Sequence, residues 1–169
     1  MAKDFLRNDG QLYRAIVRGD GRLVAQELCT GDVDLSLRIE GRSLLWHAGE
    51  RGHKWIAELL IRAGLDPNEQ YGQQQRSLLH FAAATFNYGF AGVLLDAGAK
   101  PSPCTTNGTT PLHLAARTGQ AYLAVRLLDA GATIDSRDSQ GRTPLMLAFN
   151  KGMTDVTKIL STHGGHEPS

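Results

Sequence analysis

Long hydrophobic runs are missing from this sequence of 169 residues. No apolar stretch approaches the roughly 20 residues that a membrane-spanning helix needs. An excess of charge is missing as well, because 18 basic and 17 acidic residues leave a formal net charge of +1. The first ten residues include acidic side chains and lack the apolar core of a secretory signal. These absences argue against a membrane protein and predict a soluble single domain.

Cysteine is scarce. Cys29 and Cys104 are the only two, and they lie far apart in the sequence. This spacing provides neither a disulfide framework nor the closely spaced cysteine pair of a metal site. We therefore expect free thiols in a reducing compartment and a cytoplasmic location.

Catalytic motifs are also missing. The sequence has no Gly-x-Ser-x-Gly elbow and no glycine-rich loop that would hold phosphates. His163 and His166 flank a glycine pair near the end of the chain, but zinc usually takes three or four protein ligands. The sequence thus predicts no enzymatic activity, no cofactor and no metal.

What the sequence does contain is a repeat with a period of 33 or 34 residues. The clearest copy runs from Gly108 to Gly119 and reads GTTPLHLAARTG. A period in this range is typical of stacked small units. Five alanines mark the repeat: Ala15, Ala48, Ala82, Ala115 and Ala148.

Each unit contains two short apolar helical stretches separated by a glycine and followed by a turn-rich segment. In the fourth unit, Thr110 is suited to cap the first helix and Pro111 to occupy its first position. Gly119 and Gly131 are suited to end the two helices, because glycine accepts a left-handed backbone. Such a helix pair cannot bury its apolar face alone, so neighbouring units must bury it for one another.

The TPLHLA motif, the glycine in the middle of the unit and the LLxxGA ending resemble the ankyrin repeat. The resemblance implies an all-α repeat fold, an ankyrin-type solenoid of stacked helix-turn-helix units joined by short β-hairpin-like loops. Polar helical residues, Glu27 and Lys158 among them, are expected to make the first and last units solubilising caps. We expect one domain over residues 1–169, with repeats at about 5–37, 38–71, 72–104, 105–137 and 138–165.

The same resemblance implies a non-enzymatic module that binds another protein through the hairpin tips and the residues just after the LHxA alanine. These 25 positions carry eight basic and three acidic residues, whereas the other 144 carry ten basic and fourteen acidic ones. We therefore expect a positive groove for an acidic or polar partner surface, acting as an adaptor or as an inhibitor of the immunity type. The predicted partner-binding residues are Glu40, Arg42, Glu50, Arg51, Tyr71, Gln73, Gln74, Arg76, Thr85, Thr106, Asn107, Thr109, Arg117, Thr118, Gln140, Arg142 and Lys151.

The alternative is a nucleic-acid or polyanion binder that uses the same arginines. The near-neutral net charge and the absence of aromatic residues interleaved among the groove positions disfavour it. We expect the unbound chain to be a monomer. The histidine of the TPLH motif, His80 or His113 here, is expected from the resemblance to tie neighbouring turns together, and Trp46 and His47 are expected to be packed aromatics.

The third unit departs from the pattern. Phe86 replaces the glycine in the middle of the unit, and Asn87 or Gly89 is expected to adopt the positive φ in its place. Phe90 aligns with core positions, whereas Phe86 and Tyr88 suit either space filling or binding. One extra residue lengthens the preceding loop, residues 69–76, which we expect to be tipped by Tyr71.

Overall fold

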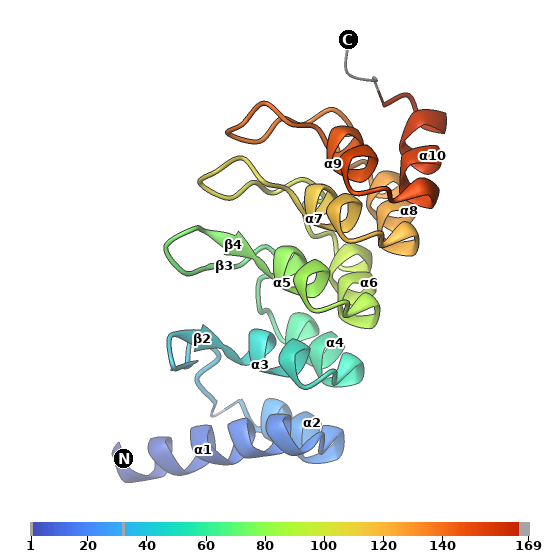
Figure 1. The fold of residues 1–169 in the computed structure, drawn as a ribbon. Helices are drawn as coiled ribbons and strands as arrows, with labels where there is room; N and C mark the ends of the chain where they lie inside the picture. Colours follow the sequence, from blue (N-terminus) through green and yellow to red (C-terminus); the bar gives the residue numbers. More distant parts are fainter. Residues whose placement is uncertain (1, 32, 166–169) are drawn as a thin grey trace. The chain divides into compact units, whose positions relative to one another are not determined.

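The computed structural model describes residues 2–31 and 33–165, without the side chains of residues 2–9 (Figure 1). The chain divides into two compact units, Met1–Pro67 and Asn68–Ser169. Both units consist of paired helices with short two-stranded hairpins, so the predicted all-α repeat fold is confirmed. One repeat domain over residues 1–169, with the five repeat boundaries, stays a prediction.

In unit 1, α1 packs against α2 and α3, and α2 packs against α4. A buried apolar core joins these helices, with Leu12, Ile16, Leu44 and Ile56 at most 1% exposed. The elements of the unit are α1 (Ala2–Arg18), α2 (Gly21–Thr30), β1 (Arg38–Ile39), β2 (Arg42–Ser43), α3 (Leu44–Glu50) and α4 (Lys54–Arg62).

One predicted cap residue of unit 1 is not on the surface. Glu27 is 7% exposed, and its carboxylate accepts a hydrogen bond of 3.0 Å from the side chain of Gln11. The prediction that Glu27 is a solubilising surface residue was therefore wrong. A carboxylate that is buried needs a hydrogen-bond donor from the protein, and the amide of Gln11 provides one.

In unit 2, α5, α7 and α9 form one row and α6, α8 and α10 a second row (Figure 1). Each helix packs against the other helix of its own repeat and against the neighbouring helix of its own row. The elements of the unit are β3 (Gln70–Tyr71), β4 (Arg76–Ser77), α5 (Leu78–Ala84), α6 (Tyr88–Asp96), α7 (Pro111–Arg117), α8 (Ala121–Asp129), α9 (Pro144–Asn150) and α10 (Thr154–Thr162).

The helix boundaries of unit 2 follow from residues that cap them. The hydroxyls of Ser77, Thr110 and Thr143 each accept a hydrogen bond from a backbone N–H three residues later, and a proline follows each threonine. Gly119, past the end of α7, has a φ of 73°. A Cβ at this glycine would lie 2.7 Å from the sulfur of Met153, whose flexible side chain would have to shift, so the positive φ is the stronger reason for glycine at this position.

The alanines that mark the repeat in unit 2, Ala82, Ala115 and Ala148, are fully buried. They lie in α5, α7 and α9, where a small side chain lets the helices of one row pack closely. Phe90 is 1% exposed, so its predicted place in the core is confirmed.

The prediction for the positive φ in the third repeat was wrong. Phe86 itself has a φ of 56°, whereas Asn87 has a φ of −87° and caps α6 with its side chain. The reason is the hydrogen-bond pattern of the turn: the N–H of Asn87 donates to the carbonyl of Ala82 at 2.9 Å, as the N–H of Gln120 does to Ala115 in the next repeat. This pattern fixes the left-handed conformation at one position, whichever residue occupies it.

The predicted tip of the longer loop was also wrong. Tyr71 lies in β3, opposite Arg76 in β4, and is partly buried. Residues 72–75 form the turn beyond it, and the N–H of Gln75 donates to the carbonyl of Gly72 at 3.1 Å. The inserted residue therefore lengthens the polar turn, and Tyr71 lies in the strand below the turn rather than at its tip.

Candidate partner-binding surface

The loops that precede α5, α7 and α9 project to the same side of unit 2 (Figure 1). Backbone hydrogen bonds join them tip to tip: the N–H of Thr106 donates to the carbonyl of Gln74 at 3.1 Å, and that of Ser139 donates to Asn107 at 2.9 Å. Four of the loop residues predicted to bind a partner, Gln74, Thr106, Asn107 and Gln140, are exposed on these tips. The loops therefore present a continuous polar edge.

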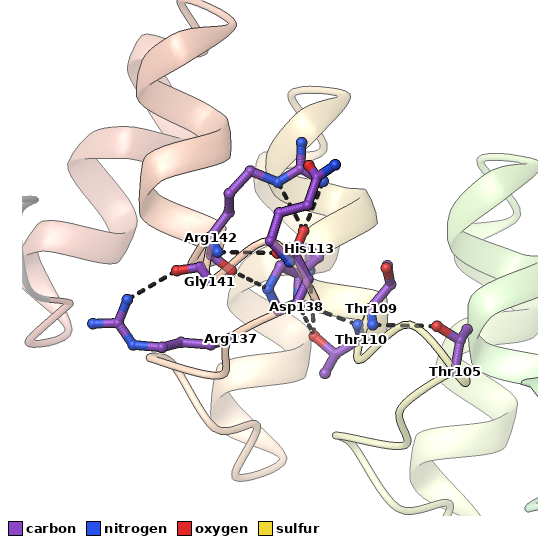
Figure 2. A network of polar contacts seen from close by, with 9 residues as sticks. Thr105, Thr109, Thr110, His113, Arg137, Asp138, Gly141 and Arg142 are labelled. Carbon is purple, nitrogen blue, oxygen red and sulfur yellow. Dashed lines mark hydrogen bonds and ion pairs between the residues drawn. The ribbon is translucent and has the colours of Figure 1, made fainter.

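Buried histidines fasten the bases of the same loops. Nε2 of His80 donates to the carbonyl of Thr109 at 2.8 Å. Nε2 of His113 donates in the same way to the carbonyl of Arg142 at 3.0 Å, as Figure 2 shows. In each ring Nδ1 accepts a backbone N–H, from Ser77 and Thr110 respectively, which fixes the neutral tautomer. The predicted role of these histidines in tying neighbouring turns is confirmed.

Burial lowers the pKa of both histidines below the ordinary value, even though the carbonyl contacts favour the charged form. The positive charge of Arg76 lowers the pKa of His80 further. His80 is therefore neutral at physiological pH and adds no charge to the surface near it.

A hollow of about 250 Å³ lies between two of the joined loops and the first helices beneath them. We call it the two-arginine hollow, because Arg76 from β4 and Arg117 from the end of α7 are the charged side chains that line it. The rest of its lining is uncharged: Gln74, His80, Ala84, Thr105, Asn107, Thr109 and Leu114. The structure thus brings five of the predicted partner-binding residues, Gln74, Arg76, Asn107, Thr109 and Arg117, together in one place.

Neither arginine of the hollow forms an ion pair with a carboxylate among the residues that the structure describes. Nε of Arg76 donates instead to the side-chain oxygen of Gln74 at 3.0 Å, which holds the guanidinium beside the loop tip. Because an arginine stays protonated at any physiological pH, the hollow carries uncompensated positive charge.

Arg142 holds the corresponding place in the last repeat but is already paired. Its Nε lies 2.8 Å and its Nη2 2.7 Å from Oδ2 of Asp138, whose other oxygen accepts the N–H groups of Gln140 and Arg142 (Figure 2). Burial opposes the charge of Asp138, but the hydrogen bonds from Arg142 and Gln140 outweigh it and lower the pKa of this carboxyl. The predicted binding residue Arg142 therefore contributes little free charge to the surface.

The predicted residues of unit 1 have mixed charge. Arg42 lies over the ring of Trp46, with its Cζ 3.8 Å from the ring centroid, in a cation–π arrangement. Oε2 of Glu50 lies 3.9 Å from Nε of Arg51, so the two charges partly offset each other. Glu40 is exposed at a φ of 53° in the hairpin turn. The positive charge predicted for these positions is thus weaker here than in the two-arginine hollow.

The aromatic neighbours of this region are packed as predicted. Trp46 and His47 are 5% and 3% exposed, and their rings meet edge to face with centroids 5.1 Å apart. The ring of Tyr13 makes a similar contact with His47.

Other predicted residues lie on the surface without joining the hollow. Gln73 and Lys151 are exposed. The hydroxyls of Thr85 and Thr118 donate to backbone carbonyls four residues earlier, at 2.9 and 2.7 Å, so they close the ends of α5 and α7. A structural use of these hydroxyls accounts for their presence.

Sequence reasoning missed Thr105 and Leu114 as lining residues of the hollow, whereas Ala84 is one of the 25 predicted groove positions. Leu114 directly precedes the repeat alanine and has the pattern of a core residue, so nothing in the sequence marks it as surface. Thr105 begins the loop turn, where its hydroxyl accepts the N–H of Thr109 at 3.2 Å (Figure 2). The turn that Thr105 begins could have been inferred from the sequence, but the two-arginine hollow beside that turn could not.

Exposed aromatic residues form a separate feature of unit 2. The rings of Tyr88 and Tyr122 meet edge to face with centroids 5.8 Å apart, at the starts of α6 and α8. They are 38% and 58% exposed, and Phe86 is 52% exposed. Tyr88 therefore packs against the ring of Tyr122, while part of its own ring stays exposed to solvent.

The described residues offer neither a metal site nor a membrane-spanning helix. Within residues 2–31 and 33–165, no three histidine, cysteine or acidic side chains lie close enough to hold a metal ion. His166, one of the two tail histidines weighed as ligands, lies outside the described residues. Cys29 and Cys104 are free, exposed thiols. Among the described helices, none is long and apolar enough to cross a membrane.

Comparisons with known proteins agree with this geometry. The family model for ankyrin repeats (3 copies) matches residues 79–169, which is more than half of the chain. The chain is also similar to E3 ubiquitin-protein ligase HACE1 of Danio rerio, at 38% identity over 60 residues. That match covers 36% of this chain but only 7% of the ligase. The chain therefore belongs to the ankyrin repeat family, whose repeats are non-enzymatic modules that mediate protein–protein interaction.

Proposed function

We propose that this chain binds an acidic or polar surface of another protein through its loop tips and the exposed ends of its first helices, as an adaptor or as an inhibitor. The observation that carries the proposal is the two-arginine hollow, where Arg76 and Arg117 keep positive charge that the described chain does not neutralise. Two exposed free thiols, Cys29 and Cys104, support a reducing, cytoplasmic location.

The joined loops support binding on energetic grounds. A loop that orders on binding loses conformational entropy, which subtracts from the affinity. Here each loop junction already has one hydrogen bond at the tip and one from a buried histidine at the base. A partner therefore meets a preorganised surface, and its binding energy is not spent on ordering the loops.

Affinity capture tests the proposal. Wild-type protein and a triple variant, R51E/R76E/R117E, are used as baits in extract from the native source, and captured proteins are identified by mass spectrometry. The matched control, R62E/K100E/K158E, makes the same change in net charge at exposed positions outside the predicted surface. We expect the wild type and the control to retain the same partner and the triple variant to lose it, with helical content unchanged in all three.

The purified partner then decides between the two roles, because an inhibitor suppresses the partner's activity at stoichiometric ratio whereas an adaptor leaves that activity intact. Capture of the same partner by the triple variant with an unchanged dissociation constant would show that the basic surface is not the binding site. Sedimentation of the unbound chain tests the predicted monomer.

Nucleic acid remains the competing ligand. Titration of duplex DNA at low and physiological salt separates the two functions, since phosphate-driven binding weakens steeply as salt rises. Tight binding to DNA that depends on Arg76 and Arg117 would replace the protein-binding proposal.

A further inference from the structure

We propose that the two-arginine hollow is a receptor for one aspartate or glutamate side chain of the partner, clamped between Arg76 and Arg117. This inference rests on the proposed function, because it names the chemical group that the protein-binding surface recognises.

The size of the hollow favours a side chain over a larger ligand. Its volume of about 250 Å³ lies below the range of about 300–1,000 Å³ that is usual for small-molecule and cofactor sites. A carboxylate side chain with its adjacent backbone is a ligand of the appropriate size. The uncharged polar residues of the lining, Gln74, Asn107 and Thr109 among them, offer hydrogen bonds to that backbone.

The charge of the hollow selects an anion. Two guanidinium groups face it, His80 is held neutral, and no carboxylate lines it. Arginine binds carboxylates with two parallel N–H donors, a geometry that lysine cannot reproduce. The lining of the hollow includes no tyrosine, tryptophan or phenylalanine on which a nucleotide base would stack, so a protein carboxylate fits it better than single-stranded nucleic acid.

The last repeat supplies an internal example of the same recognition. Arg142 and Arg76 both stand six residues before the repeat alanine, and both follow a turn in which an N–H bonds back to the carbonyl three residues earlier. In the last repeat that turn begins with Asp138, whose carboxylate forms an ion pair with the guanidinium of Arg142. In the third repeat it begins with Gly72, which has no side chain. The partner supplies to Arg76 the carboxylate that Asp138 supplies to Arg142.

The test uses a displayed library of random peptides, selected on the wild-type protein and depleted on R76Q/R117Q. Each enriched peptide is synthesised twice, once as selected and once with its acidic residues changed to the corresponding amides. Calorimetry then measures both forms against the wild type, R76Q/R117Q and the control R62Q/R126Q, whose arginines lie outside the hollow. Circular dichroism and urea unfolding establish that the variants are folded.

We expect the amide peptides to bind the wild type about 10 to 100 times more weakly than the acidic ones, the range of a lost charge-assisted hydrogen bond. R76Q/R117Q should bind both forms equally weakly, while R62Q/R126Q should match the wild type. R76K/R117K should recover part of the preference for the acidic form, because it keeps the charge without the paired donors.

The inference is overturned if no peptide prefers the wild type over R76Q/R117Q, or if the preference for the acidic form is the same in both proteins. It is also overturned if duplex DNA, and no acidic peptide, binds in a manner that depends on the two arginines. Peptides that compete with the captured partner but are indifferent to the acid-to-amide change would refute the carboxylate receptor alone and leave the protein-binding function standing.

Discussion

Replacing Phe86 by glycine should relieve a strained turn between α5 and α6. Phe86 has a φ of 56°, whereas the glycines that hold the same place in the second and fourth repeats, Gly52 and Gly119, both have a φ of 73°. A residue with a Cβ is destabilised by roughly 1–2 kcal/mol in this left-handed region. Glycine avoids this strain but loses roughly 0.5–1 kcal/mol more backbone entropy on folding than alanine.

Alanine is the appropriate reference, because F86A and F86G both remove the half-exposed ring and differ only in the Cβ. At the middle of the two ranges, the opposing effects leave F86G more stable than F86A by about 0.75 kcal/mol. The control is the preceding residue: Thr85 has a φ of −104°, so T85G should be less stable than T85A by about 0.5–1 kcal/mol.

Urea unfolding followed by circular dichroism at the helical band measures the four free energies, and equal slopes against denaturant establish that the unfolded states are comparable. An F86A variant as stable as F86G, in an experiment where the Thr85 pair behaves as expected, would refute the claim that Phe86 holds a strained backbone.

Three further outcomes follow from the packing and charges of unit 2. L127A should destabilise the chain by roughly 2–5 kcal/mol and L128A by less, as measured by urea unfolding, because Leu127 is fully buried and Leu128 only partly. The free energy of unfolding should fall as pH drops below about 6.5, by at most about 1.4 kcal/mol per pH unit for each histidine, because the lowered pKa values of His80 and His113 make the unfolded chain bind more protons; H80N/H113N should flatten this fall. D138N should remove the ion pair between Asp138 and Arg142, strengthen acidic-peptide binding at the last loop and lower the melting temperature.

Much of the fold was predictable because its signals are local. A threonine followed by proline starts a helix through a side-chain hydrogen bond and a fixed φ, and both operate within three residues of sequence. The repeat alanines were equally clear, since Ala82, Ala115 and Ala148 recur at the period of the units and all three are fully buried. The histidine of the TPLH motif was expected to bond to the neighbouring turn, and His80 and His113 both do so through a backbone carbonyl.

The errors arose where one backbone conformation is imposed on a residue that does not favour it. Asn87 and Gly89 both tolerate a positive φ more readily than Phe86 does, so residue preference pointed away from the correct position. The turn after α5 is fixed by hydrogen bonds that all the repeats share, and these bonds outweigh the preference of one side chain. The preference of a residue for a backbone conformation does not reveal that the hydrogen bonds of the turn outweigh it.

Part of the proposed binding surface follows from the sequence: five predicted residues, Gln74, Arg76, Asn107, Thr109 and Arg117, line one hollow, but the charge that this surface presents does not follow from it. Counting residues treats every arginine as equal, whereas the charge that a partner meets depends on which carboxylates lie within reach. Asp138 is four residues before Arg142, a spacing that brings no contact in an extended strand but does so in this turn. The burial of Glu27 beside Gln11 likewise depends on the packing of two helices and not on a sequence motif.

The position six residues before the repeat alanine shows what this dependence means for recognition. It holds Arg42, Arg76 and Arg142 in three repeats, yet the first lies over an aromatic ring, the second lines a hollow without a carboxylate and the third is bound to Asp138. The backbone place is the same, so the difference comes from the side chains that each loop sets beside the arginine. On the proposed binding surface we therefore expect selectivity to depend on pairs of positions within a repeat, so that substituting the neighbour of an arginine alters binding as much as substituting the arginine itself.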